Sequence, residues 1–542
     1  MNKILFSAIA CFLLFTGKIH AQLRSTADGI KLETTLRLID NLYVRDVQTD
    51  KLTEAAIRAM LRELDPHSVY LDNDEVKSMN EPLQGNFEGI GVSFNLLTDT
   101  LYIVDVISGG PSQKVGILPG DKIIYVNDTL IAGVKISSRE VMKKLRGDKG
   151  TEVKVKVKRR GSSDLIEFRI IRDKIPLHSI DATFMVADDI GYIRLSRFGA
   201  TSHNEFLEAV KKLRTQGMKR LIFDLTGNGG GILQTATDIT DEFLQKGQLI
   251  VYTEGENQPR FTRNAKGNGV FESDELVVLV DETSASASEI LSGALQDWDR
   301  AVIVGRRTFG KGLVQRQFPL PDGTMIRLTV AKYYTPTGRS IQKPYEAGNS
   351  EAYNRDVIER FNHGELMHAD SIHFPDSLQF TTLINRRVVY GGGGIMPDYF
   401  VPIDTGAITP LHRELIAKGV IFKATLAEVD HHRKQLLNRY PTVDDFKQYY
   451  HIDSLMVEEM KKIAQSDSIK WDKEQFEQSK KILYPQLKAL IARDLYEPAA
   501  YYRIIIGESD IFQEGLKIIS DRRRYHNLLK GVGSNIYPEY KQ

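Results

Sequence analysis

Three serines alternate with alanines just after a strongly apolar segment, and a lysine flanked by glycines follows them. The serines are Ser284, Ser286 and Ser288, and the lysine is Lys311. A serine hydroxyl becomes a nucleophile when a base removes its proton, and a lysine can be that base when burial lowers its pKa toward neutrality. The combination predicts acyl transfer by a Ser-Lys pair.

The elements around these residues are expected to bring them into one compact unit. The β-branched run 277–280 predicts a strand, residues 288–296 a helix, and residues 301–304 a second apolar strand that leads to the lysine. A helix N-terminus offers free N–H groups and a positive dipole end, which suit the oxyanion of acyl transfer.

Two other interpretations of this unit compete with catalysis. Ser286 and Glu289 have the capping-box spacing, so Ser286 could act only as a helix cap. The segment from Gly305 to Lys311 matches a Walker A motif except at its last position, where Gly312 replaces Ser or Thr. Because a Mg²⁺ ligand is missing and the following residues read as a strand, nucleotide binding is disfavoured.

The segments TSASASEILSGALQD and RAVIVGRRTFGKGLVQ resemble the carboxy-terminal processing peptidases, the tail-specific serine proteases of the S41 type. The resemblance implies that Ser286 is the nucleophile, Lys311 the base and Gln315 the residue that orients the lysine. On a strand, positions four apart project from the same face, which agrees with the pairing of Lys311 and Gln315. The resemblance, rather than the spacing, selects Ser286 among the serines.

A glycine-rich loop follows the apolar strand 221–225. It fails the dinucleotide pattern because Ile232 stands where the third glycine is required. By the family resemblance, this loop contributes a backbone amide to the oxyanion hole, and Gly230 is the expected donor together with the N–H of Ala287. Thr226 stands where the family usually has arginine.

Residues 83–172 predict a β-rich module that resembles a PDZ domain. The glycines of Glu88-Gly-Ile-Gly-Val-Ser-Phe94 can aim N–H groups at a carboxylate, and the next strand edge can accept a peptide strand. The resemblance implies a carboxylate-binding loop and a pocket for the terminal side chain, made by Gly89, Ile90, Gly91, Val141 and Leu145. Arg146 is a further candidate carboxylate partner, and a permissive turn is the alternative role for the glycines.

The chain begins with a signal-like segment. A basic start, an apolar run 4–15 and Ile19-His-Ala21 predict a signal peptide cleaved near Ala21, and hence an exported, periplasmic or cell-envelope protein. A lipoprotein through Cys11 and a signal anchor are the less favoured alternatives. Residues 22–82 predict helices that resemble those preceding the PDZ domain in the family, and dimer contacts or plain packing are both open for them.

Composition limits the partners. The net charge is +1, so no polyanionic partner is required, and the basic run 154–160 alternates like one solvated strand face. No nucleic acid, metal or organic cofactor is expected. Polypeptides with accessible C-termini are the expected substrates, while a homo-oligomer through the N- or C-terminal helices and an adaptor protein stay open.

The overall prediction is a multidomain α/β protein. It comprises the signal peptide 1–21, N-terminal helices 22–82, the PDZ-like module 83–172, a mixed α/β S41-type core 173–404 and a helical C-terminal extension 405–542. The insertion 342–387 reads as polar and irregular, and its histidines 363, 368 and 373 lack the spacing of a zinc site. In the extension, helices are expected at 415–439, 443–464, 473–495 and 511–529, with tyrosines 449, 450, 484 and 496 and Phe476 in its core.

The predicted function is that of an exported serine endopeptidase with a Ser-Lys dyad assisted by Gln315. Its substrates would be recognised through their C-termini by the PDZ-like module. The rival interpretation is a non-catalytic PDZ scaffold with a vestigial protease core. The intact catalytic positions and glycine loop disfavour that rival.

Overall fold

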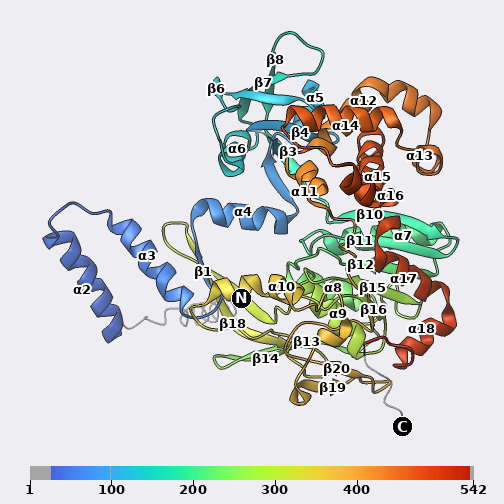
Figure 1. The fold of residues 1–542 in the computed structure, drawn as a ribbon. Coiled ribbons are helices and arrows are strands. Elements are labelled where there is room, and N and C mark those ends of the chain that lie inside the picture. The colour runs from blue at the N-terminus through green and yellow to red at the C-terminus, as the bar shows by residue number, and fades with distance from the viewer. Residues whose placement is uncertain (1–25, 98, 537–542) are drawn as a thin grey trace, which may run out of the picture.

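The structure is a computed structural model that describes residues 26–97 and 99–536. An N-terminal arm, a β-rich module, an α/β core and a set of C-terminal helices follow one another along the chain (Figure 1). The predicted signal segment 1–21, with Cys11, lies outside the described residues. Within the described ranges, no helix is long and apolar enough to cross a membrane.

The arm and its connection to the core are helical. Helices α2 (Ala27–Leu42) and α3 (Thr49–Arg62) project from one side of the molecule, and α4 (Asn73–Gln84) leads back to the β-rich module (Figure 1). None of the α2 residues is buried, so this helix packs little against the rest of its own chain.

A six-stranded sheet, called here the core sheet, organises the α/β core. Its order is β10-β11-β12-β15-β16-β21, with only β10 antiparallel to its neighbour. The strands are β10 (Ile180–Ala187), β11 (Ile190–Leu195), β12 (Arg220–Asp224), β15 (Leu276–Val280), β16 (Val302–Gly305) and β21 (Tyr399–Phe400).

Both faces of the core sheet are covered, which explains why its strands are continuously apolar. Side chains alternate between the faces, so Val278 contributes to one hydrophobic cluster and its neighbour Val277 to the other. One cluster includes α7 (Ser202–Thr215), α8 (Leu233–Asp241) and α9 (Ala287–Asp297). The other includes α17 (Asp510–Ser520) and α18 (Arg522–Leu529), so the C-terminal extension completes the protease core.

A second sheet carries the segment that follows the lysine. It consists of β1 (Val69–Leu71), β18 (Met325–Tyr334), β13 (Leu249–Gly255) and β14 (Gln258–Asn264), and β17 (Leu313–Pro319) also pairs with β18. Through β1, the N-terminal region therefore becomes part of the layer beside the candidate site.

The β-rich module has its own sheet and core. The sheet order is β3-β4-β5-β7-β8, so β3 is an edge strand, and β6 pairs with β5. Its strands are β3 (Val92–Leu97), β4 (Thr100–Val106), β5 (Lys122–Val126), β6 (Thr129–Leu130), β7 (Glu152–Lys158) and β8 (Ile166–Ile171). Helices α5 (Pro111–Val115) and α6 (Ser138–Leu145) complete it, while β2 (Asn86–Gly89) pairs with β9 (Asp173–Pro176) where the module joins the core.

The insertion 342–387 is more ordered than predicted. It contains the helix α10 (Ser350–Asn362), two short 3₁₀ turns and the strand β19 (Gln379–Thr381), which pairs with β20 (Val388–Tyr390) just after the insertion. The expectation of an irregular segment was wrong because α10 gains its stability from tertiary contacts. Tyr353 and Arg360 are buried against the core, although the helix is mostly polar.

Three of the four predicted C-terminal helices are each divided into two, namely those expected at 415–439, 443–464 and 511–529. The segment predicted at 415–439 forms α11 (Pro410–Ala417) and α12 (Val420–Arg439), separated by Gly419 with a φ of 68°. The other elements are α13 (Val443–Tyr449), α14 (Ser454–Ser466), α15 (Lys473–Leu495) and α16 (Pro498–Ile505). Tyr450 and Phe476 are buried as expected, but Tyr449 is 58% exposed, so its assignment to the core was wrong.

Candidate active site

Ser286 occupies a tight connection between β15 and α9. It is the residue before the helix, and its φ of 56° with a ψ of −109° is rare for a residue with a side chain. Such a conformation costs about 1–3 kcal/mol and persists only where the surroundings enforce it. The serine therefore sits on a strained strand-to-helix turn.

The neighbouring serines have structural partners. The hydroxyl of Ser284 donates to the Leu225 carbonyl at 2.8 Å, and that of Ser288 donates to the Asn228 carbonyl at 2.8 Å. Both side chains are fully buried, whereas Ser286 is partly exposed. The geometry thus singles out Ser286 as the accessible hydroxyl of the three, a distinction that the sequence spacing alone could not make.

Lys311 lies in the loop between β16 and β17, and its amine is tuned by its surroundings. Burial and, after it, the nearby Arg327 cation lower the pKa of Lys311 to about 8, while Glu289 and Asp65 oppose this shift. A substantial fraction of the amine is therefore neutral near physiological pH. The lysine has the property that a general base requires.

One buried carboxylate ties the serine and lysine segments together. Glu289 accepts the N–H of Ser286 at 2.7 Å and that of Lys311 at 2.9 Å, both on Oε2. Its Oε1 accepts the Gly310 N–H at 2.7 Å and the Thr308 hydroxyl at 2.5 Å. Burial raises the pKa of this fully enclosed carboxyl, and these donors oppose the shift. The capping-box spacing predicted the Ser286–Glu289 bond, but it did not predict the bonds from the lysine segment to the same carboxylate.

Tyr333 adds a second link between the same two segments. Its hydroxyl lies 3.1 Å from the Ser286 carbonyl and 2.6 Å from the Lys311 carbonyl, so it can donate to both. The ring is buried in β18. The backbones of the candidate nucleophile and base are thus held from two sides.

Gln315 is held beside the lysine loop through the second sheet. Its amide donates to the Leu313 carbonyl at 3.1 Å and to the Thr329 hydroxyl at 3.4 Å, and that hydroxyl donates to Asp65 at 3.0 Å. Lys311 precedes β17, and the register of β17 shifts between residues 314 and 315. Lys311 and Gln315 therefore do not lie on one uninterrupted strand, and the predicted shared strand face was wrong.

The expected oxyanion donors lie next to the serine. Gly230 has a φ of +101°, and a Cβ there would lie 2.8 Å from the Ser286 Cβ and 2.9 Å from the Ala287 nitrogen. The Ala287 N–H belongs to the first helical residue, where no intrahelical acceptor exists. The Gly230 N–H donates to Asn228 Oδ1 at 2.9 Å, so this N–H is already hydrogen-bonded to a side chain of the same loop.

The turn at 65–68 brings further polar groups to the lysine, which the sequence reading missed. Asp65 accepts the N–H groups of His67 at 2.8 Å and Ser68 at 3.0 Å. Burial, followed by the Lys311 cation, lowers the pKa of His67 to about 4, so this imidazole is neutral. Its Nε2 lies 3.1 Å from the hydroxyl of Tyr353, which α10 contributes.

The predicted peptide-binding residues cluster in the β-rich module. Ile90, Val141 and Leu145 are buried together in its hydrophobic core, and Gly91 has a φ of +75°. Next to this loop, Arg146 forms an ion pair with Glu81 of α4 and lies 5.0 Å from the Phe87 ring centroid. The candidate carboxylate partner is thus paired with a carboxylate of the same chain.

A strained serine at a helix N-terminus, a buried lysine of lowered pKa and adjacent backbone amides are the groups that a serine hydrolase site requires. Family models match four stretches of the chain: peptidase family S41 at 189–347, a PDZ domain at 89–170, the activating protease CtpB N-terminal domain at 16–75, and a family of unknown function at 411–497.

Curated relatives are similar over much of the chain. The carboxy-terminal-processing protease of Bartonella bacilliformis is 38% identical over 63% of this chain and 80% of its own length. The carboxy-terminal processing protease CtpA of Bacillus subtilis is 35% identical over 63% of this chain and 73% of its own. A solved photosystem II D1 C-terminal processing protease is 28% identical, covering 58% of this chain and 90% of that one, with a TM-score of 0.34.

The chain belongs to the carboxy-terminal processing proteases of peptidase family S41. It is a serine-type peptidase with a PDZ domain, an S41 core and a helical C-terminal region, as the sequence predicted.

Proposed function

We propose that Ser286 and Lys311 form the catalytic dyad of an exported endopeptidase that selects polypeptides by their C-termini. The observation that carries this proposal is the Glu289 carboxylate, which binds the N–H groups of both residues at 2.7 and 2.9 Å. One rigid group therefore fixes the backbones from which the nucleophile and the base project.

The proposed reaction begins with the neutral amine of Lys311. Lys311 Nζ takes the proton of Ser286 Oγ, which attacks the peptide carbonyl carbon, and the oxyanion accepts hydrogen bonds from the N–H groups of Ala287 and Gly230. For Gly230 to donate, its bond to Asn228 must be released or shared. Protonated Lys311 then gives its proton to the leaving nitrogen, and the acyl-enzyme forms.

Hydrolysis of the acyl-enzyme repeats the same proton transfers with water. Neutral Lys311 accepts a proton from the attacking water, and the tetrahedral intermediate collapses as the protonated lysine returns this proton to the departing Ser286 oxygen. Gln315 assists by holding the lysine loop through Leu313 and Thr329, to which its amide donates at 3.1 and 3.4 Å. No step requires a metal or an organic cofactor.

The PDZ domain supplies the substrate selection in this proposal. Its β3 edge accepts the substrate's C-terminal segment as an added strand, and the loop of Gly89, Ile90 and Gly91 binds the terminal carboxylate. Val141 and Leu145 would contact the terminal side chain of the peptide. Export rests on the signal-like start of the sequence alone.

The test is digestion of an unstructured polypeptide by purified variants. Ser286→Ala and Lys311→Ala are each expected to abolish cleavage, with unfolding free energies within about 2 kcal/mol of the wild type, the scale of a lost helix cap. Ser292→Ala is the matched control, because its hydroxyl donates to the Ser288 carbonyl one turn into the same helix. Wild-type cleavage by either dyad variant would exclude this mechanism, whereas a wild-type protein without cleavage would favour the PDZ scaffold interpretation.

A further inference from the structure

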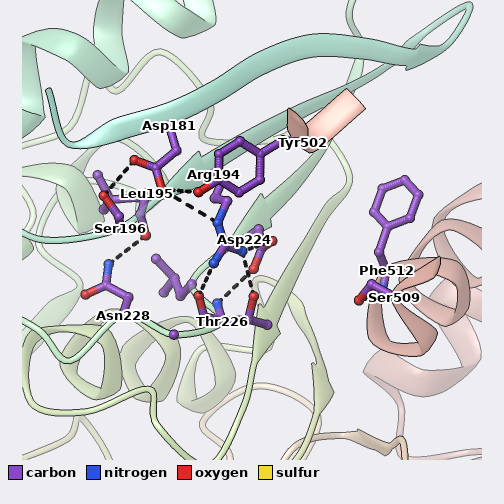
Figure 2. A network of polar contacts seen from close by, with 12 residues as sticks. Asp181, Arg194, Leu195, Ser196, Asp224, Thr226, Asn228, Tyr502, Ser509 and Phe512 are labelled. Atoms are coloured by element: carbon purple, nitrogen blue, oxygen red, sulfur yellow. Dashed lines mark hydrogen bonds and ion pairs between the residues drawn. The ribbon is translucent and has the colours of Figure 1, made fainter. Parts of the chain in front are cut away.

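An arginine from β11 reaches the start of the glycine-rich loop. Arg194 Nη1 donates to Asp224 Oδ2 and to the Thr226 hydroxyl, each at 2.7 Å, and Nη2 donates to the Thr226 carbonyl at 2.8 Å (Figure 2). Two of these bonds, from one planar guanidinium, hold both the side chain and the backbone of Thr226.

Thr226, which Arg194 holds, begins the loop that carries Gly230, the candidate oxyanion donor. Asn228 donates to the Leu195 carbonyl at 2.8 Å and accepts the Gly230 N–H at 2.9 Å, so the loop is anchored on the same strand as Arg194. The loop then places Gly230 against Ser286, with only 2.8 Å between a Cβ at Gly230 and the Ser286 Cβ. A shift at Thr226 would therefore move the Gly230 amide relative to the nucleophile.

By the family resemblance, Thr226 stands at the position of a motif arginine. In this chain a guanidinium reaches the same point from a neighbouring strand, where Arg194 is paired with Asp224 in the β11–β12 register. Arg194 of β11 thus supplies the positive charge that the threonine at position 226 does not provide.

We infer that Arg194 is a positioning residue for the oxyanion hole, which it holds in register with Ser286 through Thr226. This inference rests on the proposed function, because it assigns a use to the Gly230 amide. Arg194 itself is two strands away from Ser286 and acts through the loop, so it is not a catalytic residue.

The C-terminal extension packs an aromatic ring against this arginine. Tyr502 of α16 places its ring centroid 5.2 Å from the guanidinium carbon, and its hydroxyl donates to Asp181 Oδ2 at 3.0 Å (Figure 2). Asp181 Oδ2 is also 3.8 Å from Arg194 Nε. Burial opposes the charge, but Asp224 and the two tyrosines, Tyr192 and Tyr502, raise the pKa of Arg194 above its ordinary value. The extension thereby shields the contacts that hold the loop.

Positioning explains this arrangement better than stability does. A buried ion pair pays a large desolvation cost and often adds no net stability over an apolar replacement. Arg194→Met removes only one partner and leaves the Asp224 carboxylate buried without its cation, which is itself destabilising, so turnover is measured on the folded fraction of this variant. A second arginine, Arg220, provides the matched control. It lies at the opposite end of the neighbouring strand β12 and also joins the core to the extension. Its guanidinium donates to Asp189 at 2.5 Å and to the Ile519 carbonyl at 2.6 Å.

The experiment compares Arg194→Met, Thr226→Val and Arg220→Met in steady-state cleavage of one peptide. Arg194→Met is expected to lower kcat by roughly 10- to 100-fold with KM unchanged, less than the loss of an oxyanion donor itself. Thr226→Val, which keeps the fold and removes one of the bonds, should lower kcat by roughly 3- to 10-fold. Arg220→Met should stay within about twofold of the wild-type kcat because it lies far from the loop.

A second readout separates positioning from general damage. The affinity for a peptide aldehyde, which fills the oxyanion hole after adding to serine, should fall by the same factor as kcat, while binding of the cleaved product peptide stays unchanged. Equal kcat losses in Arg194→Met and Arg220→Met, or an unchanged kcat in Arg194→Met and Thr226→Val, would overturn the inference. An active Ser286→Ala would instead overturn the proposed function, so the two failures are distinguishable.

Discussion

Replacing Glu289 by glutamine removes the group that joins the two halves of the site. The carboxylate accepts four hydrogen bonds, two on each oxygen. A glutamine can keep the pair from Thr308 and Gly310, but its NH₂ group then faces the N–H donors of Ser286 and Lys311. Two charge-assisted bonds at about 1.5–3 kcal/mol each give a loss of roughly 3–6 kcal/mol.

The net loss of stability should lie near the lower end of that range, at about 3 kcal/mol, since the neutral amide avoids the burial of a charge. Denaturant unfolding measures this value. The kcat of the folded fraction should fall by about 100-fold, the effect of displacing reacting groups by about 1 Å. Glu282→Gln is the matched control, because Glu282 lies in the same connection between β15 and α9. Its carboxylate accepts a hydrogen bond from Arg306 at 2.6 Å.

The pH profile distinguishes positioning from simple destabilisation. Lys311 must be neutral to act, so activity rises as the pH passes its pKa of about 8. The Glu289 charge raises that pKa, so Glu289→Gln should move the acidic limb of kcat/KM to lower pH. A variant with wild-type kcat, or with its limb moved to higher pH, would refute the role assigned to Glu289.

The remaining predictions concern the lysine and the glycine loop. Arg327 lowers the pKa of Lys311, so Arg327→Met should move the acidic limb of the pH–rate profile above the wild-type position near 8; an unmoved limb would exclude this electrostatic effect. Gly230→Ala should abolish cleavage, because its Cβ would lie 2.8 Å from the Ser286 Cβ, whereas Gly229→Ala should stay active, as a Cβ there meets no atom within 4 Å. Peptidase assays of the two variants decide this, and equal activity would contradict the close approach at Gly230.

Local sequence signals predicted the elements that carry the site. The strands predicted at 277–280 and 301–304 and the helix predicted at 288–296 agree with β15, β16 and α9 to within one residue at each end, because apolar runs and helix caps act over short distances. The division of the C-terminal helices at Gly419 was missed because hydrophobic periodicity continues across a single left-handed residue.

Contacts between distant segments could not be predicted in the same way. Glu289 and Lys311 meet because β15 and β16 are adjacent in the core sheet, and Arg194 meets Thr226 because β11 lies beside β12. Helix α10 is polar by sequence, and only its packing of Tyr353 against His67 and Phe309 reveals its place beside the lysine. The family resemblance supplied Ser286 and Lys311, but it could not supply the residues that hold them in this chain.

The most direct test of the dyad is the rate at which a fluorophosphonate labels the protein as a function of pH. The proposed mechanism predicts labelling at Ser286, identified by mass spectrometry, with a rate that rises around the lysine pKa of about 8 and is lost in Lys311→Ala. Labelling at another residue, or an unchanged rate in Lys311→Ala, would contradict it.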